Sequence, residues 1–420
     1  ENKKLHKILS IKESVQYFSH SDFLQLSYTC KYINELLREK IRSNLVFIAN
    51  DKITLNNDSF MDFIKKWKNY INLNQKAITS LHGDFKHKNY SNTLKFHLLF
   101  NLNVLNLENI REINVVHFNK IIYKLKKLKI LSLKHVKMYM KETENDDLIH
   151  FQLPSTLAEL TIIDLDTRLS FSDEVHDSIY QSSDFETICK GILIAHGSSL
   201  SNLKHLRFGK PNARVILFDC ILELASNLQT LTVFDSSSID YNLARIKKLT
   251  KIKAMKVNSS DAQFNIANFR KYIPKKITEL SIGYDYETNL WPSSPIISYG
   301  FKDLQKLSIQ YNPNSNFMET LVKGLIRLKH LIIVGKPYNK DIDKLNFQNN
   351  SIQELNLIHF QYSTLNFKVF NQWKGLKKIT IDLKTSMNNY YIYFELCEML
   401  NNWKYCTFPN SVQFWNLNKN

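Results

Sequence analysis

Cysteine and glycine are scarce in this chain, and both scarcities exclude classes of site. The five cysteines are odd in number and scattered, with neither the Cys-x-x-Cys spacing of a zinc site nor the pattern of a disulfide framework. This usage favours a reducing compartment. The nine glycines form no phosphate-binding loop, and neither Gly-x-Ser-x-Gly nor His-Glu-x-x-His occurs.

No catalytic constellation stands out among the remaining residues. His82 and His87 have ligand-like spacing, but they lie in a lysine-rich stretch with only Asp84 nearby. His205 and His330 occupy equivalent positions of a repeat and are interpreted as structural. Cys30 has no adjacent base that would activate a thiol. We therefore expect no enzyme activity, no cofactor and no metal.

Long apolar runs are also missing. No stretch approaches the 18 or more residues that a membrane span requires, and no signal peptide is visible. We expect a protein of the cytoplasm or nucleus that does not enter a membrane.

Basic residues exceed acidic ones, 56 Lys and Arg against 39 Asp and Glu, for a net charge of +17. Such a surplus suits an acidic partner such as nucleic acid or an acidic peptide. Only nine of the basic residues are Arg, however, and Lys, Asn and Ile are abundant throughout, as an A/T-rich coding sequence would produce. Both explanations remain open.

The chain is organised by a hexapeptide, Leu-x-x-Leu-x-Leu, in which Ile or Val replaces Leu freely. Its copies begin at Leu102, Leu128, Leu157, Leu203, Leu228, Ile252, Ile277, Leu304, Leu328, Ile352 and Leu376, with a degenerate copy at Ile78. Successive copies start 24, 26, 29, 46, 25, 24, 25, 27, 24, 24 and 24 residues apart. A nearly fixed short period predicts a solenoid with one continuous core.

The connections between hexapeptides carry apolar residues at helical spacing. Examples are Ile121, Ile122 and Leu125; Met318, Leu321, Val322 and Leu325; and Phe367, Phe370 and Trp373. Each unit is therefore predicted as a strand, a turn and a returning helix. About 12 such units resemble the leucine-rich repeat.

A strand-helix alternation would also fit a closed barrel or a doubly wound sheet. Strands buried on both faces read as continuous apolar runs, whereas polar residues such as Asn106, Ser132 and Thr161 stand at every other position here. Barrels also need longer units and glycine-rich loops. The sequence therefore predicts an α/β solenoid with one face of its sheet open to solvent.

Residues 1–45 read as a small all-α module outside the repeat. The segment resembles the F-box, a three-helix module that precedes leucine-rich repeats in one protein family. Matching stretches are Leu9-Ser10, Val15 to Phe18, Asp22-Phe23 and Thr29-Cys30-Lys31-Tyr32. Ser10 replaces the proline of the pattern, and Tyr32 or Ile33 replaces its tryptophan.

The resemblance implies a non-catalytic substrate-recognition adaptor of a Skp/cullin/F-box ubiquitin ligase. The residues implied to dock on the Skp-type adaptor are Leu9, Ile11, Val15, Phe18, Phe23 and Leu26. Two alternatives remain: an F-box scaffold acting outside ubiquitination, such as a DNA- or centromere-associated subunit, and a plain repeat scaffold. In the ubiquitin ligase, the repeats would hold the protein substrate.

Four regions follow from these patterns: the F-box-like module (1–45), a junction and N-terminal cap (46–77), the repeats (78–385) and a C-terminal cap (386–420). The junction begins with a short strand near Leu45 to Phe47. An acidic surface insertion is predicted at 164–184, followed by a helix over 185–194, and an aromatic, proline-containing loop at 284–298.

Substrate contacts are predicted on the strand face, the inner, concave side of the solenoid. The candidates are Lys134, Lys204, Arg207, Phe234, Lys256, Tyr284 and Tyr286. Basic and aromatic side chains together predict an acidic or phosphorylated protein partner.

Overall fold

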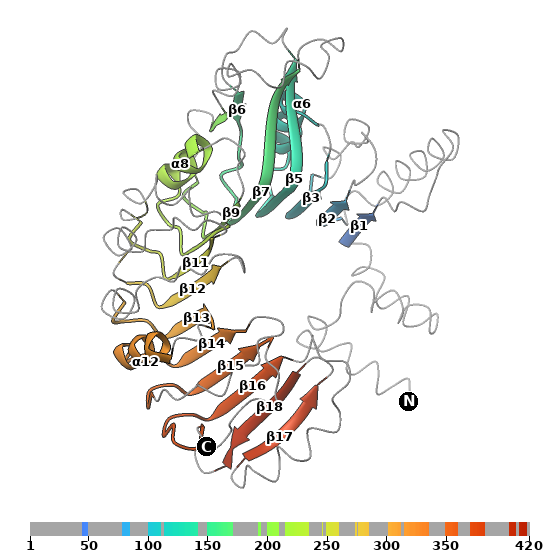
Figure 1. Cartoon of the computed structure of the whole chain (residues 1–420). Helices are drawn as coiled ribbons and strands as arrows, with labels where there is room; N and C mark the ends of the chain where they lie inside the picture. The colour runs from blue at the N-terminus through green and yellow to red at the C-terminus, as the bar shows by residue number, and fades with distance from the viewer. Residues whose placement is uncertain are drawn as a thin grey trace, which may run out of the picture. The chain divides into compact units, whose positions relative to one another are not determined.

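The computed structural model describes residues 44–48, 78–84, 100–110, 113–141, 149–170, 192–194, 200–209, 215–234, 246, 249–259, 274, 276–284, 301–311, 315–335, 349–359, 370–382, 403–408 and 411–417. The chain divides into two compact units (Figure 1). Unit 1 comprises residues 1–203 and 210–225, and unit 2 comprises residues 204–209 and 226–420.

The sheet of unit 1 is parallel and follows the hexapeptides. Its strands, in spatial order, are β1 (Asn44–Ile48), β2 (Ser80–Asp84), β3 (Val104–Glu108), β5 (Ile130–Lys141) and β7 (Glu159–Ser170). The second leucine position of each hexapeptide lies beside that of the next, so Leu81 pairs with Leu105, and Leu105 with Leu131. The sheet begins at β1, where the sequence predicted a short strand.

Two strands of unit 1 continue well past the hexapeptide. β5 and β7 pair from Ile130 and Glu159 as far as Lys141 and Ser170. Where the hexapeptide ends, His135 and Asp164 both have positive φ, 52° and 53°. Residues 164–170 were predicted as the start of a surface insertion, but Leu165 to Ser170 pair with Val136 to Lys141 of β5, which makes this part of the insertion a strand.

The other side of the unit 1 sheet is covered by short elements. α6 (Val115–Lys124) follows β4 (Ile113–Asn114), and Phe118 of the helix stacks on Phe151 with ring centroids 5.5 Å apart. Phe151 ends β6 (Ile149–Phe151), which pairs with β8 (Ile192–Ile194). The predicted helix over 185–194 is therefore wrong at its end, where Ile192 to Ile194 pair as a strand, in keeping with the two β-branched isoleucines.

Unit 2 repeats the same parallel arrangement. Its strands, in order, are β9 (His205–Gly209), β10 (Thr230–Val233), β11 (Ala254–Ser259), β12 (Glu279–Tyr284), β13 (Lys306–Gln310), β14 (His330–Val334), β15 (Glu354–Ile358) and β16 (Lys378–Asp382). Equivalent hexapeptide positions again pair, as Leu331 does with Leu307 and Leu355. The predicted solenoid of parallel strands is confirmed.

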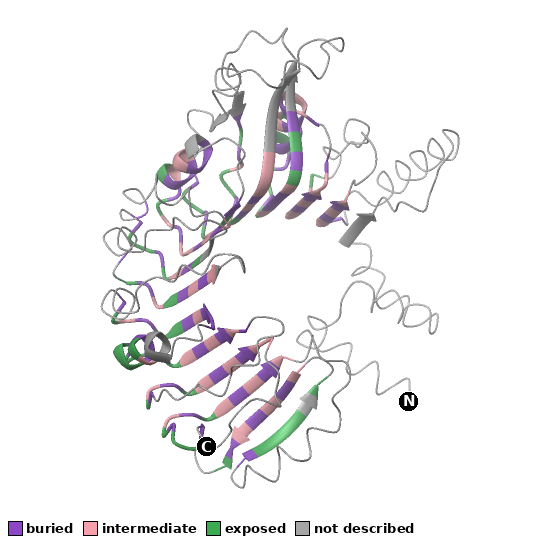
Figure 2. Ribbon diagram, in the orientation of Figure 1, coloured by how far each residue is buried: buried purple, intermediate pink, exposed green. Residues whose placement is uncertain are grey.

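Burial alternates along the strands, as a sheet with one open face requires (Figure 2). In β14, Leu331 and Ile333 are fully buried, while His330, Ile332 and Val334 are half-exposed. Each buried Leu or Ile contributes about 1.5 to 3 kcal/mol to folding. The leucine positions therefore form the core, and the positions between them form the open face.

The expected helix in every repeat is shown only in part. Among the described connections, helices are α6, α8 (Val215–Leu224) and α12 (Ser315–Gly324). Before β16 the described chain makes turns, and Phe370 and Trp373 pack edge to face there with ring centroids 5.8 Å apart. Both rings are buried and belong to the core at this point of the chain.

An antiparallel hairpin ends the sheet of unit 2. β18 (Ser411–Asn416) pairs antiparallel with β16, and β17 (Trp403–Phe408) pairs with β18. Val412 and Phe414 of β18 are buried, and Trp403 Nε1 donates to Asn371 Oδ1 at 3.0 Å. This hairpin fills the place of the predicted C-terminal cap.

The F-box-like segment lies outside the described residues, apart from the start of β1. This applies to all its predicted docking residues, Leu9, Ile11, Val15, Phe18, Phe23 and Leu26. Within the described part of the chain, no helix has the length and apolar character needed to cross a membrane.

Candidate functional site

The open face of unit 2 consists of three rows of side chains that cross the strands. The rows hold the third, fifth and seventh hexapeptide positions, which alternate with the buried fourth and sixth positions. Neighbouring strands lie about 4.8 Å apart, so equivalent side chains from successive repeats are close neighbours. A chain segment 24 or 25 residues away in sequence thus contributes the adjacent side chain.

Two of the predicted contact residues lie in the same row, that of the fifth hexapeptide position. Thr232 pairs with Arg207 on one side and with Lys256 on the other. Both cations are exposed and Thr232 is half-buried. Two strand spacings separate the cations by about 10 Å at the backbone. The structure therefore brings together Arg207 and Lys256 as one basic site on β9 to β11.

Lys204 lies at the start of this site rather than within it. It precedes β9 by one residue and is exposed, and its carbonyl accepts hydrogen bonds from Gln229 N at 2.8 Å and Thr230 N at 2.9 Å. Its backbone therefore belongs to the strand-start edge of the sheet, where the parallel ladder begins.

Phe234 is more enclosed than the sequence predicted. The side chain is half-buried and lies over Gly209 on the neighbouring strand. A Cβ atom on Gly209 would lie 2.5 Å from Cβ of Phe234. The missing side chain of Gly209 is what makes room for the ring, so Phe234 contributes packing as well as exposed area.

The remaining predicted contacts are not brought to this site by the described residues. Tyr284 ends β12, but its side chain and the whole of Tyr286 lie outside the described part. Lys134 belongs to unit 1, where its Nζ lies 3.8 Å from Glu108 Oε2.

The third-position row contains pairs that sequence reasoning missed. Lys306 Nζ lies 3.5 Å from Glu279 Oε2, and Lys378 Nζ lies 5.9 Å from the ring centroid of Trp415. For the Lys306 and Glu279 pair, the signal in the sequence was a residue of opposite charge at the same hexapeptide position one repeat away. Exposed pairs of this kind stabilise by at most about 1 kcal/mol.

The two histidines of this row are also paired. His330 Nδ1 lies 3.0 Å from Glu354 Oε2, and His205 Nδ1 lies 2.7 Å from Thr230 Oγ1. Each partner comes from the next repeat, in keeping with the structural role predicted for both rings.

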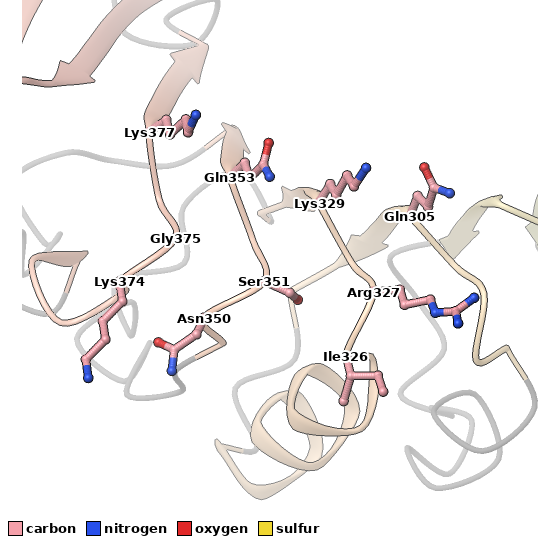
Figure 3. Close-up of a pocket in the computed structure, with 10 residues that line it drawn as sticks. All are labelled: Gln305, Ile326, Arg327, Lys329, Asn350, Ser351, Gln353, Lys374, Gly375 and Lys377. Atoms are coloured by element: carbon pink, nitrogen blue, oxygen red, sulfur yellow. The ribbon is translucent and has the colours of Figure 1, made fainter. Parts of the chain in front are cut away.

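A groove follows the strand-start edge from β13 to β16 and encloses about 530 Å³. Figure 3 shows Gln305, Lys329, Gln353 and Lys377 in a row along it. Residues of the preceding turns, among them Ile326, Arg327 and Lys374, form the other border. This edge groove was not predicted, because it lies at the second hexapeptide position and in the turns before it.

Among the described residues, no group of three or more His, Cys, Asp or Glu is arranged to hold a metal ion. His82 is half-buried in β2.

Comparisons with known proteins find likeness in fold among solved structures. No protein-family model matches the sequence, and no curated protein does. Among solved structures, the leucine-rich repeat-containing protein LegL7 from Legionella pneumophila is similar over 71% of this chain and 91% of its own, with 15% identity and a TM-score of 0.35. The repeat architecture described above rests on the hexapeptide and the strand register, and not on this likeness.

Proposed function

We propose that this chain is a non-catalytic repeat scaffold that binds a protein partner on the open face of unit 2. The observation that carries the proposal is the in-register sheet, which leaves the third- and fifth-position side chains at least partly exposed on every strand from β9 to β16. A broad surface of this kind, which spans several strands, suits an extended macromolecular contact.

The partner is acidic at its point of contact. Arg207 and Lys256 are exposed, and neither forms an ion pair within the described residues. A carboxylate or phosphate group bound between them would form charge-assisted hydrogen bonds. Arginine is suited to this role because its planar fork matches both groups.

Charge reversal tests the open face. The double variant Arg207→Glu/Lys256→Glu should weaken capture of the chain's protein partners at least tenfold, because attraction becomes repulsion. The matched control is Lys120→Glu/Lys124→Glu, which changes the net charge equally on exposed positions of α6. Quantitative pull-down comparing wild type and both variants is the measurement. Equal retention by all three would contradict the proposal.

The finer proposal is that the scaffold is the substrate-recognition subunit of a Skp/cullin/F-box ubiquitin ligase. Its support is the sequence of residues 1–45 and its place before the repeats. Catalysis would come from partner subunits, and this chain would contribute proximity between the bound protein and the ubiquitin carrier.

Co-purification with a Skp-type adaptor tests this finer proposal. Wild type should retain the adaptor, and Phe18→Asp/Phe23→Asp should lose it, because a buried charge breaks an apolar contact. The Arg207→Glu/Lys256→Glu variant should still retain the adaptor and serves as the control. Failure of wild type to bind any Skp-type adaptor would contradict the ubiquitin-ligase proposal and leave only the proposal of a repeat scaffold.

Association with DNA is a second candidate function, favoured by the net charge of +17. Binding through phosphates predicts a steep loss of affinity as salt rises. A gel-shift assay across a salt series measures this, and absence of a shift even at low salt would remove the candidate.

A further inference from the structure

The edge groove collects positive charge that the fold does not use. From residue 302 to 378, the described strand-start segments hold Lys302, Lys306, Arg327, Lys329, Lys374, Lys377 and Lys378 against Asp303 and Glu354. By contrast, the described strand ends of β13 to β16, at the seventh and eighth positions, contain no Lys or Arg. Charge is therefore concentrated at one edge of the sheet rather than spread evenly.

Three of the four cations that line the groove have no structural partner. Arg327 forms an ion pair with Asp303, Lys306 pairs with Glu279, and Lys378 lies over Trp415. In the described part of the chain, no carboxylate or ring pairs with Lys329, Lys374 or Lys377, and all three are exposed. An anion entering the groove would thus gain these contacts without breaking an existing pair.

The row along the groove alternates amide and ammonium groups. Gln305, Lys329, Gln353 and Lys377 occupy the second hexapeptide position of four successive repeats (Figure 3). Their backbones are joined in one ladder, in which Lys329 N donates to Gln305 O and Lys377 N donates to Gln353 O, both at 2.8 Å. The ladder fixes the spacing, so the two lysines stand about 10 Å apart across the strands.

The chemistry of the border favours a peptide over a nucleic acid. Glutamine and asparagine side chains both donate and accept, which matches the N–H and C=O groups of a peptide backbone, whereas a phosphate backbone only accepts. No aromatic ring on which bases could stack is among the described residues that line the groove. Ile326 is 74% exposed at its border and offers an apolar contact that a phosphate chain would not use.

We propose that the edge groove of β13 to β16 binds an extended acidic peptide segment of a partner protein. The carboxylates contact Lys329, Lys374 and Lys377, the amides of Gln305 and Gln353 bond the peptide backbone, and an apolar side chain packs on Ile326. This surface lies at the strand starts and is separate from the Arg207 and Lys256 site, so it does not depend on the function proposed for the open face.

Fluorescence anisotropy with a defined probe tests the groove on the full chain. The probe is a fluorescein-labelled ten-residue peptide of glutamate with one central leucine. The variant Lys329→Gln/Lys374→Gln/Lys377→Gln should bind it at least tenfold more weakly than wild type, because three charge contacts are removed. The control is Lys120→Gln/Lys124→Gln/Lys137→Gln, which removes the same charge from exposed positions of unit 1 and should bind as wild type does.

Two further comparisons identify the ligand class. Ile326→Ser should weaken binding of the leucine-containing probe about threefold and leave an all-glutamate probe unchanged, because only the first buries apolar surface. A labelled 20-nucleotide thymidine strand and a 20-base-pair duplex should bind more weakly than the peptide at equal salt.

Each outcome decides the proposal. Loss in the groove variant with retention in the control supports it. No binding by wild type overturns it. Equal loss in both triple variants also overturns it and indicates that net charge alone attracts the probe. Tighter binding of either nucleic acid at the groove lysines overturns the peptide assignment. None of these results alters the open-face test, because Arg207 and Lys256 are unchanged in every variant.

Discussion

Asn349 shows how one polar side chain can end a helix from a distance. It is 8% exposed, and its Nδ2 donates to the carbonyls of Val322 at 2.5 Å and Leu325 at 3.2 Å. Both carbonyls belong to the last turn of α12 and the residue after it, and they also accept from Leu325 N at 3.3 Å and Leu328 N at 3.1 Å, so Asn349 supplies each with a second donor. Its Oδ1 accepts from Ser351 N at 2.8 Å. One side chain therefore joins two repeats.

Replacing this side chain should destabilise unit 2. Asn349→Ala removes the two hydrogen bonds that Nδ2 donates across the repeats, and we expect a loss of about 2 kcal/mol in the free energy of unfolding, at about 1 kcal/mol for each bond. The neighbouring Asn350→Ala, at an exposed position, should change it by less than about 0.5 kcal/mol. Urea denaturation measures both. Equal stability of the two variants would show that the amide does not hold the helix end.

Gly375 acts through the absence of a side chain. A Cβ atom there would lie 2.2 Å from the carbonyl oxygen of Asn350 in the preceding turn. Only glycine lets these two turns approach so closely. The border of the edge groove is therefore set by backbone contact between repeats as well as by the lysines.

At the scale of elements, most side-chain pairs of the sheet join successive repeats. Asn109 Nδ2 donates to Asp84 Oδ1 at 2.8 Å, and His135 Nδ1 lies 2.9 Å from Asp164 Oδ2. Each pair spans 25 to 29 residues of sequence. The register places equivalent positions of two repeats side by side, as for His135 and Asp164, and Asn109 follows Glu108, the register partner of Asp84.

The helix α6 begins at a side-chain cap. Asn114 is its N-cap, and its Oδ1 accepts from His117 N at 3.0 Å. Asn114→Ala should lower the free energy of unfolding by about 1 kcal/mol, and Asn114→Ser, which retains an acceptor, should restore most of it. Thermal or urea unfolding, monitored by a signal from unit 1, provides the measurement. Identical stability of the alanine and serine variants would argue against capping.

On the scale of the whole molecule, each strand contacts only its neighbours in the sheet, as in other solenoids. The hairpin of β17 and β18 is the last neighbour of β16 in unit 2. It satisfies one edge of β16 with antiparallel hydrogen bonds. Damage to the hairpin should therefore spread to β16 first and fade along the sheet.

Phe414 offers a test of this spread. The side chain is 2% exposed in β18, and Phe414→Ala should destabilise by about 3 kcal/mol. Hydrogen exchange should then accelerate in β16 and β15 and remain unchanged in β9 and β10, because stability in repeat sheets is local. Uniform acceleration from β9 to β18 would instead indicate that unit 2 unfolds as one cooperative block.

The sequence by itself determined the repeat and its register. A leucine period of 24 to 29 residues over most copies fixes which residues are buried, since only one alignment brings Leu81, Leu105 and Leu131 into one core. It also predicted the open face, including Arg207 and Lys256 on it. These features depend on the local pattern of residues and on the hydrophobic effect, and both can be read from the sequence alone.

The tertiary structure decided the features that depend on which neighbouring segment a residue pairs with. β5 and β7 extend past the hexapeptide because each provides the other with backbone donors and acceptors as far as Lys141 and Ser170. Phe370 and Trp373 pack edge to face before β16, an arrangement of two buried rings that the spacing of residues alone does not give. The edge groove exists because separate turns meet across repeats at Gly375, a contact between residues more than 20 positions apart that no local pattern encodes.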